Sequence, residues 1–384
     1  MGKIYKKVSA FTSVITGGTP STKIKEYWDG GEINWLSSGD LNQGVIKYSS
    51  KKITDLGYQK SVTKIMPIGT VAIALTGATT GVCGILEIEA CGNQSVTGIL
   101  PSKNHDSKYL FYYLRSLREK IMNDSFGGAQ QHINQQYVKD ILVPIVSVDE
   151  QKQIAKRLAK AQELIDLRKE SIAKLDELAK SIFIDMFGDP VINPKGWEVK
   201  NLNQVCINKG EYGSGASAID YNPLLPRYLR ITDINDNGSL KYEKKSPSIV
   251  ENKYLLNKFD IVFARSGATV GKTYLHTTNE KLLYAGYLIK FMPNIQIINP
   301  SFLFYFTKTE YYKGWISSKQ NVVAQPNINA KEYGSLNIIV PSIDLQNKFA
   351  QIIEKIEEQK LLYEQELAKL EENFQVLLQQ SFVE

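Results

Sequence analysis

Two stretches of the sequence hold residue types that could do chemistry on phosphate esters. Ser266–Thr273 is close to the glycine-rich loop whose backbone N–H groups cradle nucleotide phosphates. Asp233 and Glu243, followed by Lys244 and Lys245, offer the carboxylates and the lysine with which metal-dependent nucleases hold magnesium and activate water. These residues motivate one hypothesis, a self-sufficient DNA-binding nuclease or ATPase with catalytic residues of its own.

Both patterns are incomplete. The phosphate-binding loop needs four residues between its glycines, whereas three separate Gly267 from Gly271. A second copy of the stretch, Gly77–Gly84, lacks the Lys-Thr pair, and the segment 49–52 has no counterpart of Glu243. We therefore expect neither ATP binding nor catalysis by this chain.

Other catalytic or metal-binding patterns are also missing. The histidines, His105, His132 and His276, are scattered without ligand spacing or triad partners. The three cysteines, Cys83, Cys91 and Cys206, include no CxxC pair. No glycine-rich methyl-donor loop follows a strand, and no Asn-Pro-Pro-aromatic segment is present to hold a flipped adenine. We expect a binding subunit with no metal and no cofactor in this chain.

The elements that position these residues follow an internal repeat with a period near 195 residues. Four matches share an offset of 195: Asp149-Glu150-Gln151 with Asp344-Leu345-Gln346, Ala173-Lys174-Leu175 with Ala368-Lys369-Leu370, Phe187 with Phe382, and Ile133-Asn134 with Ile328-Asn329. Gly77-Ala78-Thr79 matches Gly267-Ala268-Thr269 at an offset of 190. Duplication followed by divergence of loops explains the drift in the offset.

Each repeat ends in a predicted long helix. The helices follow Pro144 and Pro341, with Ser147 and Ser342 as N-caps, and the first should end at Gly188. Apolar residues step by three and four along both helices: Leu158, Ile165, Ile172, Leu175 and Ile182 in the first, Ile353, Ile356, Leu367, Leu370, Phe374 and Leu377 in the second. This spacing predicts an antiparallel coiled coil of helices about 57 Å long.

Two charged residues lie within the apolar stripes, and three leucines of the first helix lie outside its stripe. Arg168 and Lys360 interrupt the two apolar stripes. Leu164, Leu167 and Leu178 lie away from the main stripe of the first helix, where they could contact the chain's own modules or form a docking face for another protein.

The segment that precedes each long helix is predicted to be a β-rich module. Expected strands include Thr70–Leu75, Gly84–Ile88, Asp260–Ala264 and Leu336–Val340, bounded by Gly, Pro or Asn. Helices are expected over Lys108–Asn123 and Pro300–Tyr312. The predicted fold class is α+β, with globular modules at 1–147 and 189–342 and long helices at 148–188 and 343–384.

Charge follows the same division. The two modules carry net charges of +5 and +6, while the two helical segments carry zero and −5. Two similar basic modules favour a shared polyanionic partner such as DNA. No apolar run reaches the roughly 18 residues of a membrane span, and no secretory signal is evident, so a soluble cytoplasmic protein is expected.

Polar loops in both modules supply the candidate DNA-binding residues. Asn and Gln can pair with adenine edges and Arg and Lys with guanine, while tyrosines and lysines among them could contact phosphates. The candidates are Thr16, Gly18, Thr19, Ser21, Ser37, Ser38, Thr76, Thr79, Gln130, Gln131 and Asn134 in the first module, and Ser214, Arg230, Arg265, Ser266, Thr269, Lys272, Gln320, Asn321, Gln325 and Asn327 in the second.

Together these residues resemble a known family, the specificity (S) subunits of type I restriction-modification enzymes. The resemblance is carried by Thr16–Ser21, Tyr27–Leu36, Arg265–Gly271, Gln325–Ile328, and the two helix starts Pro144–Gln151 and Pro341–Gln346. It covers essentially the whole chain. The first module has Leu75-Thr76 where the second has Ala264-Arg265, so an arginine contact does not carry over to it.

The resemblance implies two target recognition domains and two spacer helices. Each domain would read one part of a bipartite target in double-stranded DNA, and the helices would set the gap between the parts. Two methyltransferase subunits would bind and methylate adenine, and restriction subunits could add cleavage. S-adenosylmethionine, ATP and magnesium are expected only on these partners.

Two other classes of function stay open at this point. One is the nuclease or ATPase already described, in which the purified chain would cut DNA or hydrolyse ATP. The other is a coiled-coil scaffold that does not bind DNA, which weak salt dependence of DNA affinity would favour.

Overall fold

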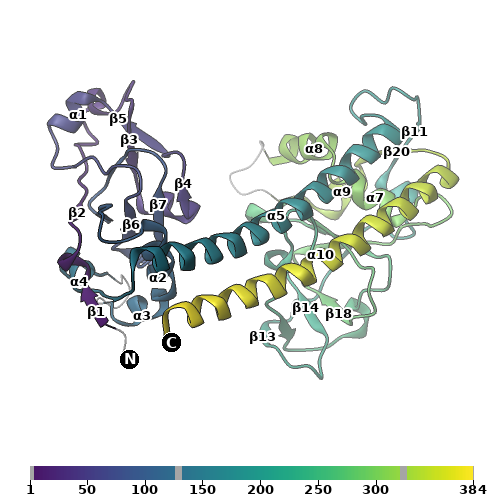
Figure 1. Cartoon of the computed structure of the whole chain (residues 1–384). Coiled ribbons are helices and arrows are strands. Elements are labelled where there is room, and N and C mark those ends of the chain that lie inside the picture. Colours follow the sequence, from purple (N-terminus) through teal and green to yellow (C-terminus); the bar gives the residue numbers. More distant parts are fainter. Residues whose placement is uncertain (1–3, 126–131, 321–326, 384) are drawn as a thin grey trace. The chain divides into compact units, whose positions relative to one another are not determined.

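The computed structural model describes residues 4–125, 132–320 and 327–383. It divides into two compact units. Unit 1 comprises Met1–Arg168 and Glu366–Glu384, and unit 2 comprises Lys169–Gln365. The long helices α5 (Val148–Phe187) and α10 (Ile343–Val383) each contribute residues to both units (Figure 1).

Unit 1 is built on three small sheets. The central one has the strand order β2-β9-β6-β7-β4, and β5-β3-β8 and β1-β10 form the others. The strands are β1 (Ile4–Lys7), β2 (Val14–Thr16), β3 (Ile33–Leu36), β4 (Val45–Ile46), β5 (Lys51–Ile53), β6 (Val71–Ala74), β7 (Cys83–Leu86), β8 (Cys91–Gly92), β9 (Val96–Ile99) and β10 (Leu142–Ile145). The helices are α1 (Asp55–Gln59), α2 (Ser107–Ser116), α3 (Arg118–Asn123) and α4 (Gln135–Asp140).

Unit 2 repeats this plan with small changes. Its central sheet has the order β12-β19-β16-β17, beside the pairs β11-β20, β13-β15 and β14-β18. The strands are β11 (Glu198–Asn201), β12 (Glu211–Tyr212), β13 (Ala218–Asp220), β14 (Arg227–Leu229), β15 (Lys245–Pro247), β16 (Ile261–Ala264), β17 (Thr273–Leu275), β18 (Leu282–Tyr284), β19 (Leu288–Phe291) and β20 (Asn337–Val340). The helices are α6 (Leu202–Val205), α7 (Pro300–Phe306), α8 (Glu310–Gln320) and α9 (Ala330–Gly334).

The first and last strands of each module pair in the same way. Ile4 faces Ile145 across the antiparallel pair β1-β10, and Glu198 faces Val340 across β11-β20. Each module is thereby closed by its own ends immediately before a long helix begins.

Local chemistry sets the bounds of α5. The Ser147 hydroxyl accepts a hydrogen bond from the Glu150 backbone N–H at 3.2 Å, which caps the first turn. Gly188 follows the last helical residue with φ of 81°, a left-handed conformation that favours glycine. The Lys195 ammonium donates to the carbonyls of Asp185 and Met186 at 2.9 Å each, so the carbonyls of the last turn are paired.

The two long helices pack against each other within each unit. In unit 1, Leu158 and Ile165 of α5 share a core with Phe374 of α10, and Leu367, Leu370 and Leu377 pack beside them. In unit 2, Ile353 and Ile356 of α10 share a core with Leu175 and Ile182 of α5. The first half of α5 thus meets the second half of α10, and the reverse holds in unit 2, so the pair is antiparallel.

Ile172 is half-buried and belongs to neither core, whereas Leu164, Leu167 and Leu178 are exposed. The two charged interruptions of the stripes are paired across the helices. Arg168 lies 2.7 Å from Glu366, and Lys360 lies 2.5 Å from Asp176.

A repeated glutamine docks the start of each long helix. Gln151 accepts a hydrogen bond from the Asp106 backbone N–H at 2.8 Å and donates to the Val146 carbonyl at 3.0 Å. Its counterpart Gln346 accepts from the Asn299 N–H at 2.8 Å and donates to the Pro341 carbonyl at 2.8 Å. Both side chains are buried, which explains why this position is shared between the repeats.

The expected helical segments over 108–123 and 300–312 are confirmed, and each consists of two helices. The first breaks at Leu117 and the second over Thr307–Thr309. At the second break the Thr307 and Thr309 hydroxyls donate to the carbonyls three residues earlier, at 2.7 and 2.8 Å. Such back-bonding competes with helix continuation.

The mixed helix and strand content, the two repeated modules and the paired long helices confirm the predicted fold class. In the described part of the chain, no helix combines the length and apolar character needed to cross a membrane.

Candidate DNA interface

A glycine-containing turn joins two central strands in both units. It lies between β6 and β7 in unit 1 and between β16 and β17 in unit 2, and Gly77 and Gly267 take φ of 73° and 66°. The Thr79 hydroxyl donates to the Thr76 carbonyl at 3.1 Å, and the Thr269 hydroxyl donates to the Ser266 carbonyl at 3.0 Å. The candidate hydroxyl residues therefore shape the turn itself in both units.

The lysine of this turn in unit 2 is not presented to a ligand as it would be in a nucleotide-binding loop. The Lys272 ammonium lies 2.8 Å from an Asp236 carboxylate oxygen and donates to the Ile234 carbonyl at 3.2 Å. It is thus held against the chain by its own neighbours. The lysine fixes the turn to the segment that precedes it in sequence.

A second segment pairs with each turn. The Ile133 N–H donates to the Leu75 carbonyl at 2.9 Å, and the Ile328 N–H donates to the Arg265 carbonyl at 2.8 Å. Asn134 and Asn329, which follow, cap α4 and α9. The repeat thus brings the turn and this polar segment together in both units.

In unit 2 this arrangement gathers several candidate residues. Arg265 Nε donates to Asn327 Oδ1 at 3.2 Å, and Ser266 bridges to the Asn327 backbone. The Arg265 guanidinium lies 4.8 Å from the centre of the Tyr212 ring. Tyr212 was not a candidate from the sequence, because the segment that holds it has no visible match in the first module. The guanidinium and the exposed Asn327 form a polar surface that suits base or phosphate contacts.

The polar turn 16–21 of unit 1 is held from several sides. The Thr16 and Thr97 hydroxyls lie 2.8 Å apart, and the Thr19 hydroxyl donates to Gln94. The carbonyls of Gly18 and Ser21 accept from the indoles of Trp35 and Trp28, at 3.0 and 3.1 Å. Two tryptophans therefore fix the path of this turn.

Other candidates occupy structural positions. Ser214 is buried, and its carbonyl accepts from the Tyr228 hydroxyl at 3.0 Å. Ser37 caps the 3-10 helix that begins at Ser38, and the Thr76 hydroxyl donates to Ser95 at 2.8 Å. Gln130, Gln131, Asn321 and Gln325, together with the side chain of Gln320, lie outside the described residues.

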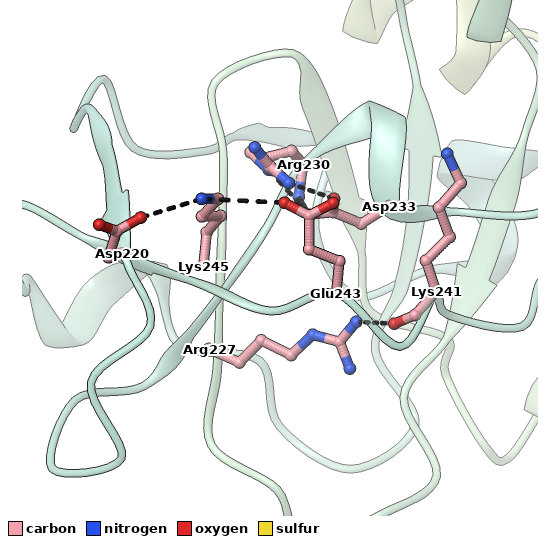
Figure 2. Close-up of polar contacts among 7 residues, drawn as sticks. All are labelled: Asp220, Arg227, Arg230, Asp233, Lys241, Glu243 and Lys245. Atoms are coloured by element: carbon pink, nitrogen blue, oxygen red, sulfur yellow. Dashed lines mark hydrogen bonds and ion pairs between the residues drawn. The ribbon is translucent and has the colours of Figure 1, made fainter. Parts of the chain in front are cut away.

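The carboxylates of the nuclease hypothesis are engaged with cations. Arg230 Nη2 lies 2.6 Å from Asp233 Oδ1, and the Arg230 backbone N–H also donates to this carboxylate at 2.9 Å. Figure 2 shows Lys245 between Asp220 and Glu243, 3.0 and 3.8 Å from their oxygens. Asp233 also raises the pKa of Arg230 through this hydrogen bond.

Histidines and cysteines occupy separate places. Across residues 4–125, 132–320 and 327–383, no three His, Cys, Asp or Glu side chains are arranged to hold a metal ion. Burial raises the pKa of the Cys83 thiol to about 12 and that of Cys91 to about 11, so both thiols stay protonated at neutral pH. Burial also lowers the pKa of His105 and of His276.

Comparison with known proteins identifies the repeated architecture. The profile of the type I restriction modification DNA specificity domain matches residues 5–177 and again residues 194–372. The chain belongs to this family.

A curated relative in the family agrees over nearly the full length. The type I restriction enzyme MjaIX specificity subunit of Methanocaldococcus jannaschii is 25% identical over 377 residues, which cover 91% of this chain and 86% of the relative. The predicted resemblance is confirmed, and the chain is a specificity subunit, the non-catalytic DNA-recognition component of a type I restriction-modification system. None of the comparisons supports the nuclease or ATPase alternative.

Solved structures support the same fold. The S subunit of a type I restriction-modification system from M. genitalium matches 100% of this chain and 96% of its own, with a TM-score of 0.56 and 18% identity. A second match is a chain from a structure of the assembly and conformational transition of the type I restriction-modification system. The match covers 99% of this chain and 97% of that chain, with a TM-score of 0.57 and 15% identity.

Proposed function

We propose that this chain reads a bipartite sequence in double-stranded DNA and positions two methyltransferase subunits for adenine methylation. The observation that carries the proposal is the matched turn and polar segment in both units. Each unit supplies its own set of polar side chains around this matched frame, so each suits a different half of the target. Restriction subunits would join the same assembly for cleavage.

The long helices provide the surface for these partner subunits. Leu164, Leu167 and Leu178 of α5 are between 44% and 50% exposed, and apolar side chains at such positions suit helix packing by a partner. The chemistry would reside on the partners. S-adenosylmethionine would bind the methyltransferase subunits, and ATP and magnesium would serve the restriction subunits.

The proposal is tested by producing the chain together with candidate methyltransferase subunits and mapping methylated adenines on genomic DNA. We expect a stable complex and methylation at one motif with two specific parts separated by a fixed gap. Methylation at a continuous motif, or a complex whose motif does not change when this chain is exchanged for another specificity subunit, would contradict the proposal.

The catalytic alternative is tested on the same material. The purified chain without partners should neither cleave DNA nor hydrolyse ATP in the presence of magnesium. If it does either, Glu243→Ala and Lys272→Ala separate a nuclease site from a phosphate site, because each removes one member of the two sequence patterns.

A further inference from the structure

A short loop with the same two residues at its start follows the 3-10 helix Ser38–Gln43 and β4 in unit 1, and the 3-10 helix Ile231–Asp233 in unit 2. We name residues 47–51 and 241–245 the lysine-tyrosine loops, because they begin Lys47-Tyr48 and Lys241-Tyr242. Each also ends in lysine, at Lys51 and Lys245, and the two loops are 194 residues apart. The repeat offset was the signal in the sequence that could have identified them.

A buried aspartate fixes the base of each loop. Asp40 accepts hydrogen bonds from the Ser37 N–H at 2.7 Å and from the Ser50 N–H at 3.0 Å. In unit 2 the Asp233 carboxylate accepts from the Arg230 N–H at 2.9 Å, and the Asp233 carbonyl accepts from the Lys241 N–H, also at 2.9 Å. The base of each loop is therefore set before any ligand arrives.

A residue on the neighbouring strand braces the side of each loop. In unit 1 the Ser49 hydroxyl donates to Asn34 Oδ1 on β3 at 3.1 Å. In unit 2 Arg227 Nη2 on β14 donates to the Lys241 carbonyl at 2.5 Å, as Figure 2 shows. Asn34 and Arg227 occupy equivalent positions in the two repeats, so two different side chains support the loop at the same place.

The first two side chains of each loop point into solvent. Tyr48 is 65% exposed and Tyr242 is 93% exposed. Lys47 and Lys241 are exposed too, and neither forms an ion pair within the part of the chain that the structure describes. The later lysines of the second loop differ, since Lys244 lies 2.7 Å from Glu280 and Lys245 lies 3.0 Å from Asp220.

We propose that the Lys47-Tyr48 and Lys241-Tyr242 pairs bind the sugar-phosphate backbone of DNA, one pair on each half of the target. A lysine ammonium and a tyrosine hydroxyl both donate hydrogen bonds to phosphate oxygens. The proposal rests on the proposed function, because it assumes that both units contact DNA.

The pattern of sharing favours the backbone over the bases. The two units would read different base sequences, yet every DNA half-site presents the same sugars and phosphates. The pair is common to both loops, whereas the residues between the tyrosine and the final lysine are Ser49-Ser50 in one and Glu243-Lys244 in the other. A shared pair suits the feature that both half-sites share.

The test measures DNA affinity against salt concentration for the full chain assembled with its methyltransferase subunits. The variants are Lys47→Ala, Tyr48→Ala, Lys241→Ala and Tyr242→Ala. The matched controls are Lys7→Ala and Lys253→Ala, which remove one positive charge from the same units but from lysines that lie 2.7 Å from Asp140 and 3.1 Å from Glu251.

We expect Lys47→Ala and Lys241→Ala each to lower the magnitude of the slope of log affinity against log salt by about 1. Each should lose a similar amount of affinity for target and for non-target DNA. The tyrosine variants should weaken both kinds of DNA about equally without changing the slope. The controls should keep both the slope and the affinity. The methylated motif should stay the same in every variant.

The outcomes separate this inference from the proposed function. If the unmodified complex does not bind DNA, the proposed function fails. If it binds and the loop variants match their controls, only the loop inference is overturned. A change of methylated motif would assign the pairs to base reading, and loss of complex assembly on size-exclusion chromatography at unchanged DNA slope would assign them to a protein contact; either result overturns the backbone role.

Discussion

At the scale of single residues, the two buried glutamines show what the repeat preserves. Gln151 and Gln346 each join the first turn of a long helix to the backbone of the module that precedes it. The shared triplets that revealed the repeat in the sequence are thus partly a record of buried hydrogen bonds.

Replacing one of these glutamines should destabilise its unit. Gln346→Leu leaves the Asn299 N–H and the Pro341 carbonyl without their partner, at a cost of about 2 kcal/mol in the free energy of unfolding. Urea unfolding measures this loss. Gln351→Leu makes the same chemical change at an exposed position of α10 and should leave stability nearly unchanged. Equal effects from the two variants would contradict the docking role.

Lys308 gives unit 2 a specific pH dependence. Burial, together with nearby Lys180, lowers the pKa of Lys308 from its usual 10.5 to about 7, although the Asp236 and Asp176 carboxylates oppose the shift. The folded state therefore binds its proton less tightly than the unfolded state does. Stability should rise as pH increases from about 7 toward the usual pKa of lysine.

Urea unfolding between pH 6.5 and 9.5 checks this expectation. Lys308→Met should remove most of the rise in stability, because the residue at this position then binds no proton in either the folded or the unfolded state. Lys313→Met, a change at an exposed lysine 2.6 Å from Glu310, should retain it. Parallel pH profiles for the wild type and Lys308→Met would contradict the assignment.

At the scale of elements, the helix pair breaks the symmetry of the repeat at one buried position. Lys360, only 7% exposed, corresponds to the apolar Ile165 of the first repeat. Its ammonium pairs with Asp176 across the helices, so the interruption of the apolar stripe is compensated within unit 2. A buried pair of this kind can specify which helices associate and in which register.

A double-mutant cycle tests the coupling between these two residues. Lys360→Ile leaves the half-buried Asp176 carboxylate unpaired and should lower the free energy of unfolding by about 3 kcal/mol. The double variant Lys360→Ile with Asp176→Leu should recover most of that loss, since neither member of the pair is left as an unpaired charge. Thermal or urea unfolding gives the coupling energy, and additive effects of the two single changes would mean that the pair is not coupled.

Sequence reasoning reached some elements of this structure more readily than others. The 195-residue offset and the stepping of apolar residues predicted the long helices, because helix periodicity is local and α5 and α10 carry it over many turns. The breaks at Leu117 and at Thr307–Thr309 were missed, since threonine and serine hydroxyls can turn back on a helix without any change in hydrophobic pattern.

The candidate site was predictable mainly where the repeat was visible. The turns at Gly77 and Gly267 and the segments around Ile133 and Ile328 were recognisable because their sequences match. The contact between Arg265 and Tyr212 could not be inferred, because it joins residues far apart in sequence and has no equivalent in the first module.

At the scale of the whole molecule, α5 continues without interruption from residues of unit 1 to residues of unit 2. If the helices set the gap in the target, removing a heptad from each should shorten it. Deleting residues 166–172 and 363–369 removes Arg168 and Glu366 together, keeps the Lys360–Asp176 pair, and preserves the apolar stripe.

Seven residues of helix correspond to about 10 Å, or about 3 base pairs of DNA. Mapping of methylated adenines with this deletion variant should show the same two half-sites separated by a gap shorter by about that amount. The same gap in the variant and the wild type would refute the role of the helices as a spacer.

The division of the chain also has a consequence for the order of folding during synthesis. Unit 2 is one continuous stretch, Lys169–Gln365, whereas the core of unit 1 includes Phe374, Leu378 and Phe382 from the far end of α10. On the ribosome, the module of unit 1 is synthesised first, but its apolar face is covered only after the end of α10 has been made. Unit 2 is synthesised later and can nevertheless complete its fold earlier. A premature stop shortly after residue 365 would therefore spare unit 2 and leave unit 1 with exposed apolar surface, a form that chaperones and proteases would recognise.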